Sequence, residues 1–388
     1  MKWAAVHSTL PDPQQAAQDA AGRLLDALGD GPIDLVLAFY STELTTGAEE
    51  VRECLMRTLA PGCLAGVSAA GVITTDAEIE HGPALSLVGA RLPGVSVSPF
   101  LLGGSEWGDE IATADLFDLY APGARGAELA LLFADPYTLD MPKTLHVLRE
   151  YAPGLRVVGG MASSGMGQGG NMLFLNEWLS PEGGMCIALS GAMRADVIVS
   201  QGCRPIGPPM TVTKAERNYL IELDDEPALE RFNGVLAALT PEEHAHLGSG
   251  LFVGRPVHGD AEGRGDYLIR NVIGADRVRG VVAVGDLIES DERIRLHVRD
   301  GDTAREDLEM LLLPQSVDTR AHAALVFSCN GRGSNLYSGP DGDITPLQDA
   351  LGGQVPAAGF FCNGEIGPVG DRNYVHGHTA SIAIIRPA

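Results

Sequence analysis

A strand–helix–strand pattern occurs three times along the chain, and this repeat constrains the fold more than any other feature. In each copy a run of apolar residues typical of a buried strand precedes a helix, and a glycine-bearing strand follows. The first strands are predicted at 34–40, 129–135 and 323–329, and the second strands at 63–73, 156–165 and 355–364. Each second strand carries two glycines separated by four residues, namely Gly66 and Gly71, Gly160 and Gly165, and Gly359 and Gly364. The similar spacing indicates an internal repeat.

Strand–helix–strand segments of this length suit right-handed βαβ units. In the third copy the helix is predicted to have Thr345 as its N-cap and Pro346 at its first position. Further strands of antiparallel type follow the copies, at 84–92, 95–102, 185–193, 196–201 and 378–386. The repeat therefore predicts an α/β fold with mixed sheets and helices on their outer faces.

A region of different pattern, 215–314, separates the second copy from the third. The Pro- and Gly-rich stretch 205–209 precedes it and is typical of a domain boundary. We therefore expect two α/β domains, 1–210 and 211–388.

The chain is strongly acidic, because 51 Asp and Glu residues against 27 Lys and Arg residues give a formal net charge of −24. Such a surface repels phosphate backbones and anionic lipid, which disfavours nucleic-acid and membrane-surface binding. The first residues, MKWAAVHSTLPDPQQ, lack a signal-peptide pattern, and no apolar run reaches the roughly 18 residues of a membrane span. We expect a cytoplasmic protein that binds neither nucleic acid nor membranes.

The six cysteines are scattered along the chain without a CxxC pair or another metal-type spacing. This distribution disfavours a disulfide framework and a zinc site. We expect six reduced thiols and no structural metal.

Two apolar strands end in the same tripeptide, Cys-Asn-Gly, and the candidate site is predicted there. The segments are LVFSCNGRG at 325–333 and AGFFCNGEIGPVGDRNYVHGHT at 358–379. Each places a thiol, an amide and backbone N–H groups at the C-terminal end of a strand, where α/β sheets commonly bind ligands. Turn-forming glycines and cysteines acting as small apolar residues are the alternative explanation.

The charged side chains of these segments add chemistry to the thiols. Arg332 follows Cys329 by three residues and would favour its thiolate. Cys362 lies at the equivalent point of the second segment, and Glu365 after it could pair with Arg332 or bind a ligand amine. The amides beside the two cysteines are Asn330 and Asn363.

Two further pairs could contribute to ligand binding. Arg270 and Asn271 end an apolar strand, where the arginine could hold a ligand carboxylate or form a salt bridge with an acidic residue. His376 and His378 would point to the same face of a strand, an arrangement that could bind a metal or haem iron. Because no third ligand lies nearby in the sequence, we expect no cofactor, with haem as the alternative.

Hydroxyl and amide groups from the first two copies are the remaining candidates. Ser163 and Ser164 could contact a ligand, as could Ser68 and Asn171, or they could stabilise turns.

Several motifs resemble those of the FIST proteins, which have paired N- and C-terminal FIST domains. The most specific are SCNGRG at 328–333, AGFFCNGEIGPV at 358–369 and HGHTASIAII at 376–385, joined by DYLIRNVIG at 266–274 and HVRDGDTA at 297–304. AVHST at 5–9 and GVSAAGVI at 66–73 are similar to the N-terminal domain.

The resemblance implies a sensory module of signal transduction that binds small ligands such as amino acids. It also implies a separate signalling partner, because the similarity covers nearly the whole chain. A related bacterial branch binds haem and senses nitric oxide, and relatives with an F-box suggest an interaction scaffold. From the residues, the competing hypothesis is an enzyme with Cys329 or Cys362 as nucleophile, a histidine as base and Glu365 as orienting acid.

Overall fold

The computed structural model consists of two compact units. It describes residues 1–388 except 104–106, 108–110, 112, 258–266 and 319. The first unit contains Met1–Val199, Leu308–Val375 and Thr379–Ala388, and the second contains Ser200–Asp307 and His376–His378. The predicted mixed α/β class is confirmed. The predicted segments 1–210 and 211–388 do not coincide with the compact units, and that division stays a prediction.

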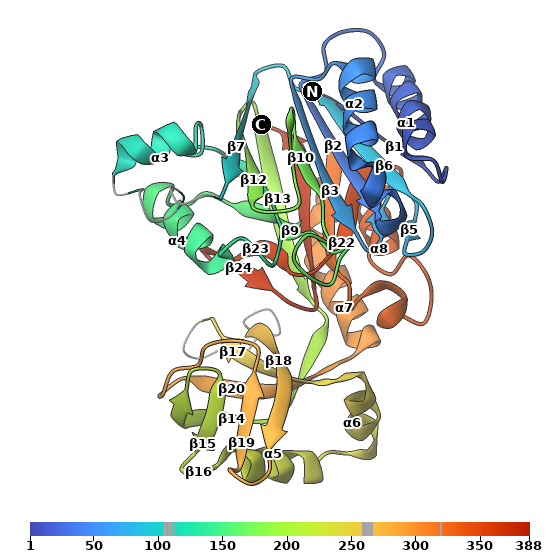
Figure 1. The fold of residues 1–388 in the computed structure, drawn as a ribbon. Helices are drawn as coiled ribbons and strands as arrows, with labels where there is room; N and C mark the ends of the chain where they lie inside the picture. Colours follow the sequence, from blue (N-terminus) through green and yellow to red (C-terminus); the bar gives the residue numbers. More distant parts are fainter. Residues whose placement is uncertain (104–106, 108–110, 112, 258–266, 319) are drawn as a thin grey trace. The chain divides into compact units, whose positions relative to one another are not determined.

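The first unit is built from three mixed sheets of the same design (Figure 1). The first sheet has, in spatial order, β1 (Lys2–Ser8), β6 (Leu85–Arg91), β2 (Leu35–Ser41), β3 (Cys63–Ala69), β10 (Leu173–Leu175) and β11 (Trp178–Ser180). The second has β24 (Arg372–His376), β23 (Glu365–Val369), β9 (Val157–Met161), β8 (Leu129–Ala134), β12 (Gly184–Gly191) and β7 (Val95–Leu102). The third has β13 (Met193–Gln201), β25 (Thr379–Pro387), β21 (Ala323–Cys329), β22 (Ala357–Cys362), β4 (Val72–Ile73) and β5 (Glu78–Ile79).

The centre of each sheet is one copy of the predicted repeat. The parallel pairs are β2 with β3, β8 with β9, and β21 with β22. Helices cover the outer faces: α1 (Pro13–Leu28) and α2 (Ala48–Leu59) on the first sheet, α3 (Ala114–Tyr120) and α4 (Met141–Tyr151) on the second, α7 (Gly301–Leu312) and α8 (Ile344–Leu351) on the third. The predicted repeat and the outer helices are therefore confirmed.

The inner faces of the three sheets share a single apolar core. Side chains alternate along a strand, so every second residue points inward. The inward residues are Leu35, Leu37 and Phe39 in β2, Leu129, Leu131 and Phe133 in β8, and Ala323, Leu325 and Phe327 in β21. The residues between them face the helices.

Phe39, Phe133 and Phe327, the triangle phenylalanines, occupy the fifth position of their strands and meet at the centre of this core. Their ring centroids lie 5.8, 6.1 and 5.6 Å apart in three edge-to-face contacts, a favoured aromatic geometry. The nearly equal distances show that the three copies are arranged around an approximate threefold axis.

Each copy also lends a short strand to a neighbouring sheet. The strand that follows the repeat leaves its own copy, so β4 joins the third sheet, β10 the first and β23 the second. Matching backbone hydrogen bonds hold these exchanges, from Ser68 N–H to Met172 O (3.0 Å), Met161 N–H to Gly364 O (2.9 Å) and Phe361 N–H to Gly71 O (3.0 Å). The second strands of all three copies therefore end close together.

The glycine equivalence predicted for the second copy is shifted by one residue. Gly66 and Gly359 pair with Ala38 and Val326, each directly before a triangle phenylalanine. In the second copy the residue at that register is Gly159, not Gly160.

The second unit is an antiparallel sheet that closes on itself, because its first strand also pairs with β15. Its strands are β14 (Cys203–Glu216), β20 (Arg293–Arg299), β17 (Leu251–Pro256), β18 (Tyr267–Asp276), β19 (Val281–Val284), β15 (Tyr219–Leu223) and β16 (Glu226–Pro227), and its helices are α5 (Ala228–Ala237) and α6 (Pro241–His246). Residues 205–209, where a domain boundary is predicted, lie within β14. Its register shifts between Ile206 and Met210, where prolines cannot donate to the ladder.

Every helix in the described part of the chain is too short or too polar to cross a lipid bilayer.

Candidate functional site

The third copy departs from the other two beside the triangle phenylalanines. In each sheet the triangle phenylalanine is the register partner of one residue on the neighbouring parallel strand. On its other side, that residue is the register partner of the first residue of the short strand that another copy lends to the sheet. These first residues are Val72, Leu173 and Glu365. Two copies thus have a buried apolar side chain where the third has a carboxylate, and Glu365 is 0% exposed.

Thiols accompany the carboxylate in the same copy. Strands β21 and β22 end side by side with Cys329 paired to Cys362. The same pairs in the other copies are Ser41 with Ala69 and Asp135 with Ala162. We call Cys329, Cys362 and Glu365 the thiol–carboxyl cluster.

The carboxyl group of Glu365 is held by the start of β25. Thr379 donates two hydrogen bonds to Oε2, from its backbone N–H (3.1 Å) and its hydroxyl (2.8 Å). Burial raises the pKa of Glu365 to about 8, although Thr379, Arg332 and the Cys329 thiol act to lower it. Near neutral pH the group is therefore mostly a neutral acid, in contact with Cys329.

Cys362 is buried against Gly160 of the second copy, which has no side chain to occupy the space of the thiol. A side chain at Gly160 would place its Cβ 2.2 Å from the Sγ of Cys362. Burial, reinforced by the neighbouring Glu365, raises the pKa of the Cys362 thiol well above its usual value. Cys362 is therefore a neutral thiol in the resting protein.

Cys329 is the accessible member of the cluster. It is partly exposed, whereas the other five cysteines are buried. The backbone N–H of Gly331 donates to its Sγ at 3.4 Å. A donor aimed at sulfur favours the thiolate, as does the nearby Arg332 charge.

Arg332 is fully buried and forms its ion pair with Asp343, whereas pairing with Glu365 was one of the two roles predicted for that carboxylate. Its Nε and Nη2 donate to Asp343 at 3.0 and 2.6 Å, and Nη2 also donates to Tyr337 at 2.5 Å. Burial acts to lower the pKa of Arg332, but Asp343 and Tyr337 together raise it above its usual value. The third nitrogen, Nη1, is buried and has no hydrogen-bond partner among the residues that the structure describes.

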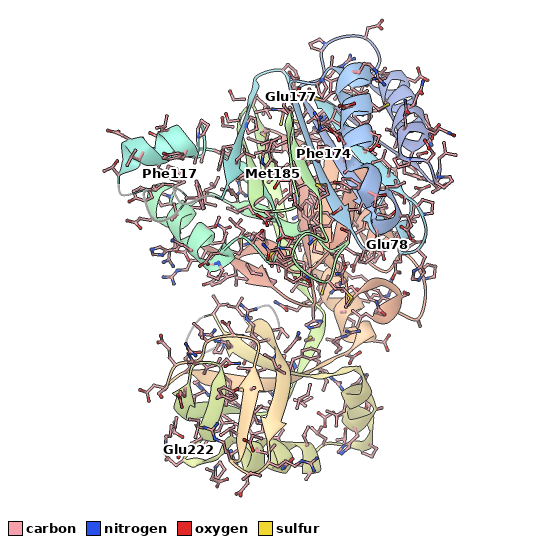
Figure 2. The ribbon with its side chains drawn as sticks, in the orientation of Figure 1. Glu78, Phe117, Phe174, Glu177, Met185 and Glu222 are labelled. Carbon is pink, nitrogen blue, oxygen red and sulfur yellow. The ribbon has the colours of Figure 1, made fainter. Side chains whose placement is uncertain are left out.

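A carboxylate of the first copy supports this ion pair. Glu78, labelled in Figure 2, belongs to β5 and accepts the backbone N–H groups of Asp343 (2.7 Å) and Ile344 (2.9 Å) at the start of α8. Burial and the Asp343 charge raise the pKa of Glu78 to about 7. The first copy therefore fixes the loop that carries Arg332.

A pocket of about 170 Å³ lies among residues of the first and third copies. Its lining includes Asn330 and Phe361, which adjoin Cys329 and Cys362 in the sequence. The side-chain oxygen of Asn330 is buried and, among the described residues, accepts no hydrogen bond. The other residues of the lining are Ala70, Gly71, Glu80, His81 and Asn335. Asn363, also predicted as a site residue, is exposed and outside this lining.

Ser163 and Ser164 connect the copies around the axis. Ser163 accepts from Ala70 N–H at 2.9 Å and donates to Phe361 O. Ser164 donates to Ser68 at 2.7 Å, and Asn171 accepts from Ser164 at 3.1 Å. These hydroxyls are engaged in bonds between copies, which supports the predicted structural alternative for them.

The other four predicted residues lie in the second unit. Arg270 donates to Asp286 at 2.7 Å, so the predicted salt-bridge alternative holds for it. His378 contacts Asn271 at 2.9 Å. The expectation that His376 and His378 share one strand face is wrong, because β24 ends at His376 and His378 has a left-handed backbone with φ 63°. Within the described chain, no three His, Cys, Asp or Glu side chains are grouped to hold a metal ion.

Comparison with known proteins gives the family. The FIST N domain matches residues 34–226, and the FIST C domain matches residues 228–368. The chain belongs to the FIST family. FIST domains are sensory domains of signal transduction.

Full-length relatives occur in mycobacteria. An uncharacterized protein of Mycobacterium bovis is 35% identical over 97% of this chain and 96% of its own length. An uncharacterized protein of Mycobacterium tuberculosis strain H37Rv is 34% identical over 97% of both chains. Among solved structures, the cyanuric acid hydrolase of A. caulinodans covers 100% of this FIST protein at 8% identity and a TM-score of 0.34, which is too low to support a shared fold.

Sequence reasoning missed three contributors to the site: Glu78, Asp343 and Gly160. Glu78 and Asp343 meet only because the first copy lends strands to the third sheet. For Asp343 a signal existed, since an arginine predicted near a strand end needs an acidic partner when it is buried.

Proposed function

We propose that this FIST protein is a cytoplasmic sensor that binds an amino acid, or a similar small carboxylate with an amine, at the thiol–carboxyl cluster and Arg332. The observation that carries this proposal is the internal comparison between copies. The third copy alone buries a carboxyl group where the others bury Val72 and Leu173. Burying such a group costs stability, so its presence favours a binding role.

The chemistry of the proposed site suits a zwitterion. Glu365 would accept the ligand amine, and the buried Nη1 of Arg332 would donate to the ligand carboxylate. The pocket lined by Asn330 and Phe361, of about 170 Å³, is smaller than the roughly 300 Å³ at which pockets for drug-sized ligands begin. Its size favours a molecule of amino-acid dimensions over haem.

Ligand binding would be linked to a proton. Because burial raises the pKa of Glu365 to about 8, the carboxyl is mostly protonated near neutral pH. An ammonium group beside it favours the charged carboxylate, so binding releases the proton to solvent. The affinity for an amine should therefore increase as the pH rises toward 8.

A thermal-shift screen over free amino acids tests the proposal, followed by calorimetry in two buffers of different ionisation enthalpy. A ligand at about 100 times its dissociation constant adds about 2.7 kcal/mol of stability, a shift of several degrees. Calorimetry should show the release of close to one proton, which Glu365→Gln abolishes and Glu177→Gln, a change at an exposed carboxylate, preserves. A flat screen, or equal binding by Glu365→Gln, would refute the site.

Haemin belongs in the same screen, because a saturable Soret band would move the proposal toward gas sensing. A separate partner protein that reads the ligand state completes the proposed function.

A further inference from the structure

We propose that Cys329 and Cys362 form a dithiol pair that hydrogen peroxide oxidises to a disulfide, with Glu365 as the base that removes the Cys329 proton. This reaction would be a property of the protein in addition to ligand sensing, and it needs no bound ligand.

The two cysteines are placed to form a bond. They are register partners on adjacent parallel strands, so both side chains lie on the same face of the sheet. Strand neighbours lie about 4.8 Å apart, within the range of about 4.4–6.8 Å between the Cα atoms of a disulfide. Asn330 N–H donates to Cys362 O at 3.0 Å and fixes this register at the strand ends.

Access selects Cys329 as the attacking residue. Cys329 is partly exposed, whereas Cys362 is buried. Cys362 would then be the resolving thiol, protected from direct oxidation until its partner has reacted.

The surroundings of Cys329 supply what a nucleophilic thiol needs. Glu365 contacts the thiol and can take its proton, and the Gly331 N–H and the buried Arg332 stabilise the thiolate that results. Burial raises the pKa of Glu365 to about 8, so the ionised form that can take the proton becomes abundant only as the pH approaches 8.

The reaction balances in two steps. First the Cys329 thiolate attacks peroxide: an S–O bond forms, the O–O bond breaks, and the departing hydroxide takes the proton held by Glu365 and leaves as water. Sulfur loses two electrons and peroxide gains them, which gives a sulfenic acid. Then Cys362 attacks the Cys329 sulfur, the S–S bond forms, and the S–O oxygen leaves with the Cys362 proton as a second water.

The other copies provide substitutions that the fold already tolerates. The first copy has Ser41 and Ala69 where the third has Cys329 and Cys362. Cys329→Ser and Cys362→Ala therefore mimic a natural copy.

The experiment is titration of the purified protein with hydrogen peroxide at about pH 8, close to the pKa of Glu365, followed by alkylation and peptide mapping without reduction. The wild type should lose two of its six thiols and give one cross-link between the peptides of Cys329 and Cys362. Cys362→Ala should instead stop at a sulfenic acid on Cys329, which a cyclic 1,3-dione traps. Cys329→Ser should leave Cys362 reduced, and Cys54→Ala, the matched control, should react like the wild type.

The role of Glu365 as the base is tested by the rate at which peroxide oxidises Cys329. Glu365→Gln should slow the loss of Cys329 by at least about tenfold, because general-base catalysis contributes at least that much. Retention of all six thiols in excess peroxide, or oxidation of Cys362 in Cys329→Ser, would overturn the pair. A Glu365→Gln rate equal to that of the wild type would overturn the role of the base. If Glu365→Gln does not fold, the two cysteine variants still decide the proposal.

Discussion

Glu365 should make this protein less stable as the pH rises, which is unusual for a carboxylate. Burial raises its pKa from 4.5 to about 8. The folded state therefore keeps a proton that the unfolded state releases between these two values. Stability from this group is fully present below the unfolded pKa and is lost as the pH rises toward 8. Glu365→Gln removes the titration and keeps the shape of the side chain.

The size of the effect follows from the two pKa values. Where the unfolded carboxyl is ionised and the folded one is protonated, each pH unit is worth about 1.4 kcal/mol. From about pH 5.5 to about pH 7.5 the wild type should therefore lose roughly 2.5 kcal/mol relative to Glu365→Gln. This window lies above the isoelectric point of about 4.7, where solubility is lowest.

Urea denaturation of both proteins across this window measures the difference. Glu78, whose pKa is raised to about 7, titrates in both proteins, so its contribution cancels when the two curves are subtracted. Glu177→Gln, at an exposed carboxylate, should follow the wild type at every pH. Parallel stability curves for wild type and Glu365→Gln would refute the burial argument.

Two further predictions concern packing around the cluster. Asp343→Asn should lower the free energy of unfolding by about 3–5 kcal/mol in urea denaturation, because it leaves Arg332 buried without its carboxylate. The double variant Arg332→Met with Asp343→Leu should lower it clearly less. Equal losses in the single and double variants would contradict this. Gly160→Ala should cost about 1–3 kcal/mol because its Cβ would meet the Cys362 sulfur, and Cys362→Ala should recover most of that loss in a double-mutant cycle. Additive losses would mean that the contact is not the cause.

Much of the architecture could be predicted because it follows from local patterns in the sequence. The inward and outward alternation around Phe39, Phe133 and Phe327 is a period-two signal, and the helices between the strands have apolar stripes. The thiols at the strand ends were predicted for the same reason, since Cys329 and Cys362 follow apolar runs directly.

The remaining features depend on contacts that no local pattern records. β4 has only two residues, and nothing in its sequence says that it pairs with β22 rather than with its own copy. The helix was predicted with Thr345 as its N-cap and Pro346 at its first position, but α8 begins at Ile344 with Asp343 as its N-cap. Its first N–H groups bond to Glu78, which lies 266 residues away in the chain. The Pro- and Gly-rich stretch 205–209, taken as a boundary signal, lies at a register shift within a strand.

The pseudo-threefold fold explains how one copy can contain a buried carboxyl group that lowers stability. The triangle phenylalanines and the matching backbone bonds stabilise all three copies in the same way. Where Val72 and Leu173 bury apolar surface, the third copy buries Glu365 and loses that contribution. Two copies with ordinary cores can offset such a loss, because stability is shared across one cooperative unit. The position at which one copy differs from the other two therefore indicates where the functional site lies. This comparison within one chain points to the cluster of Cys329, Cys362 and Glu365 without reference to any other protein.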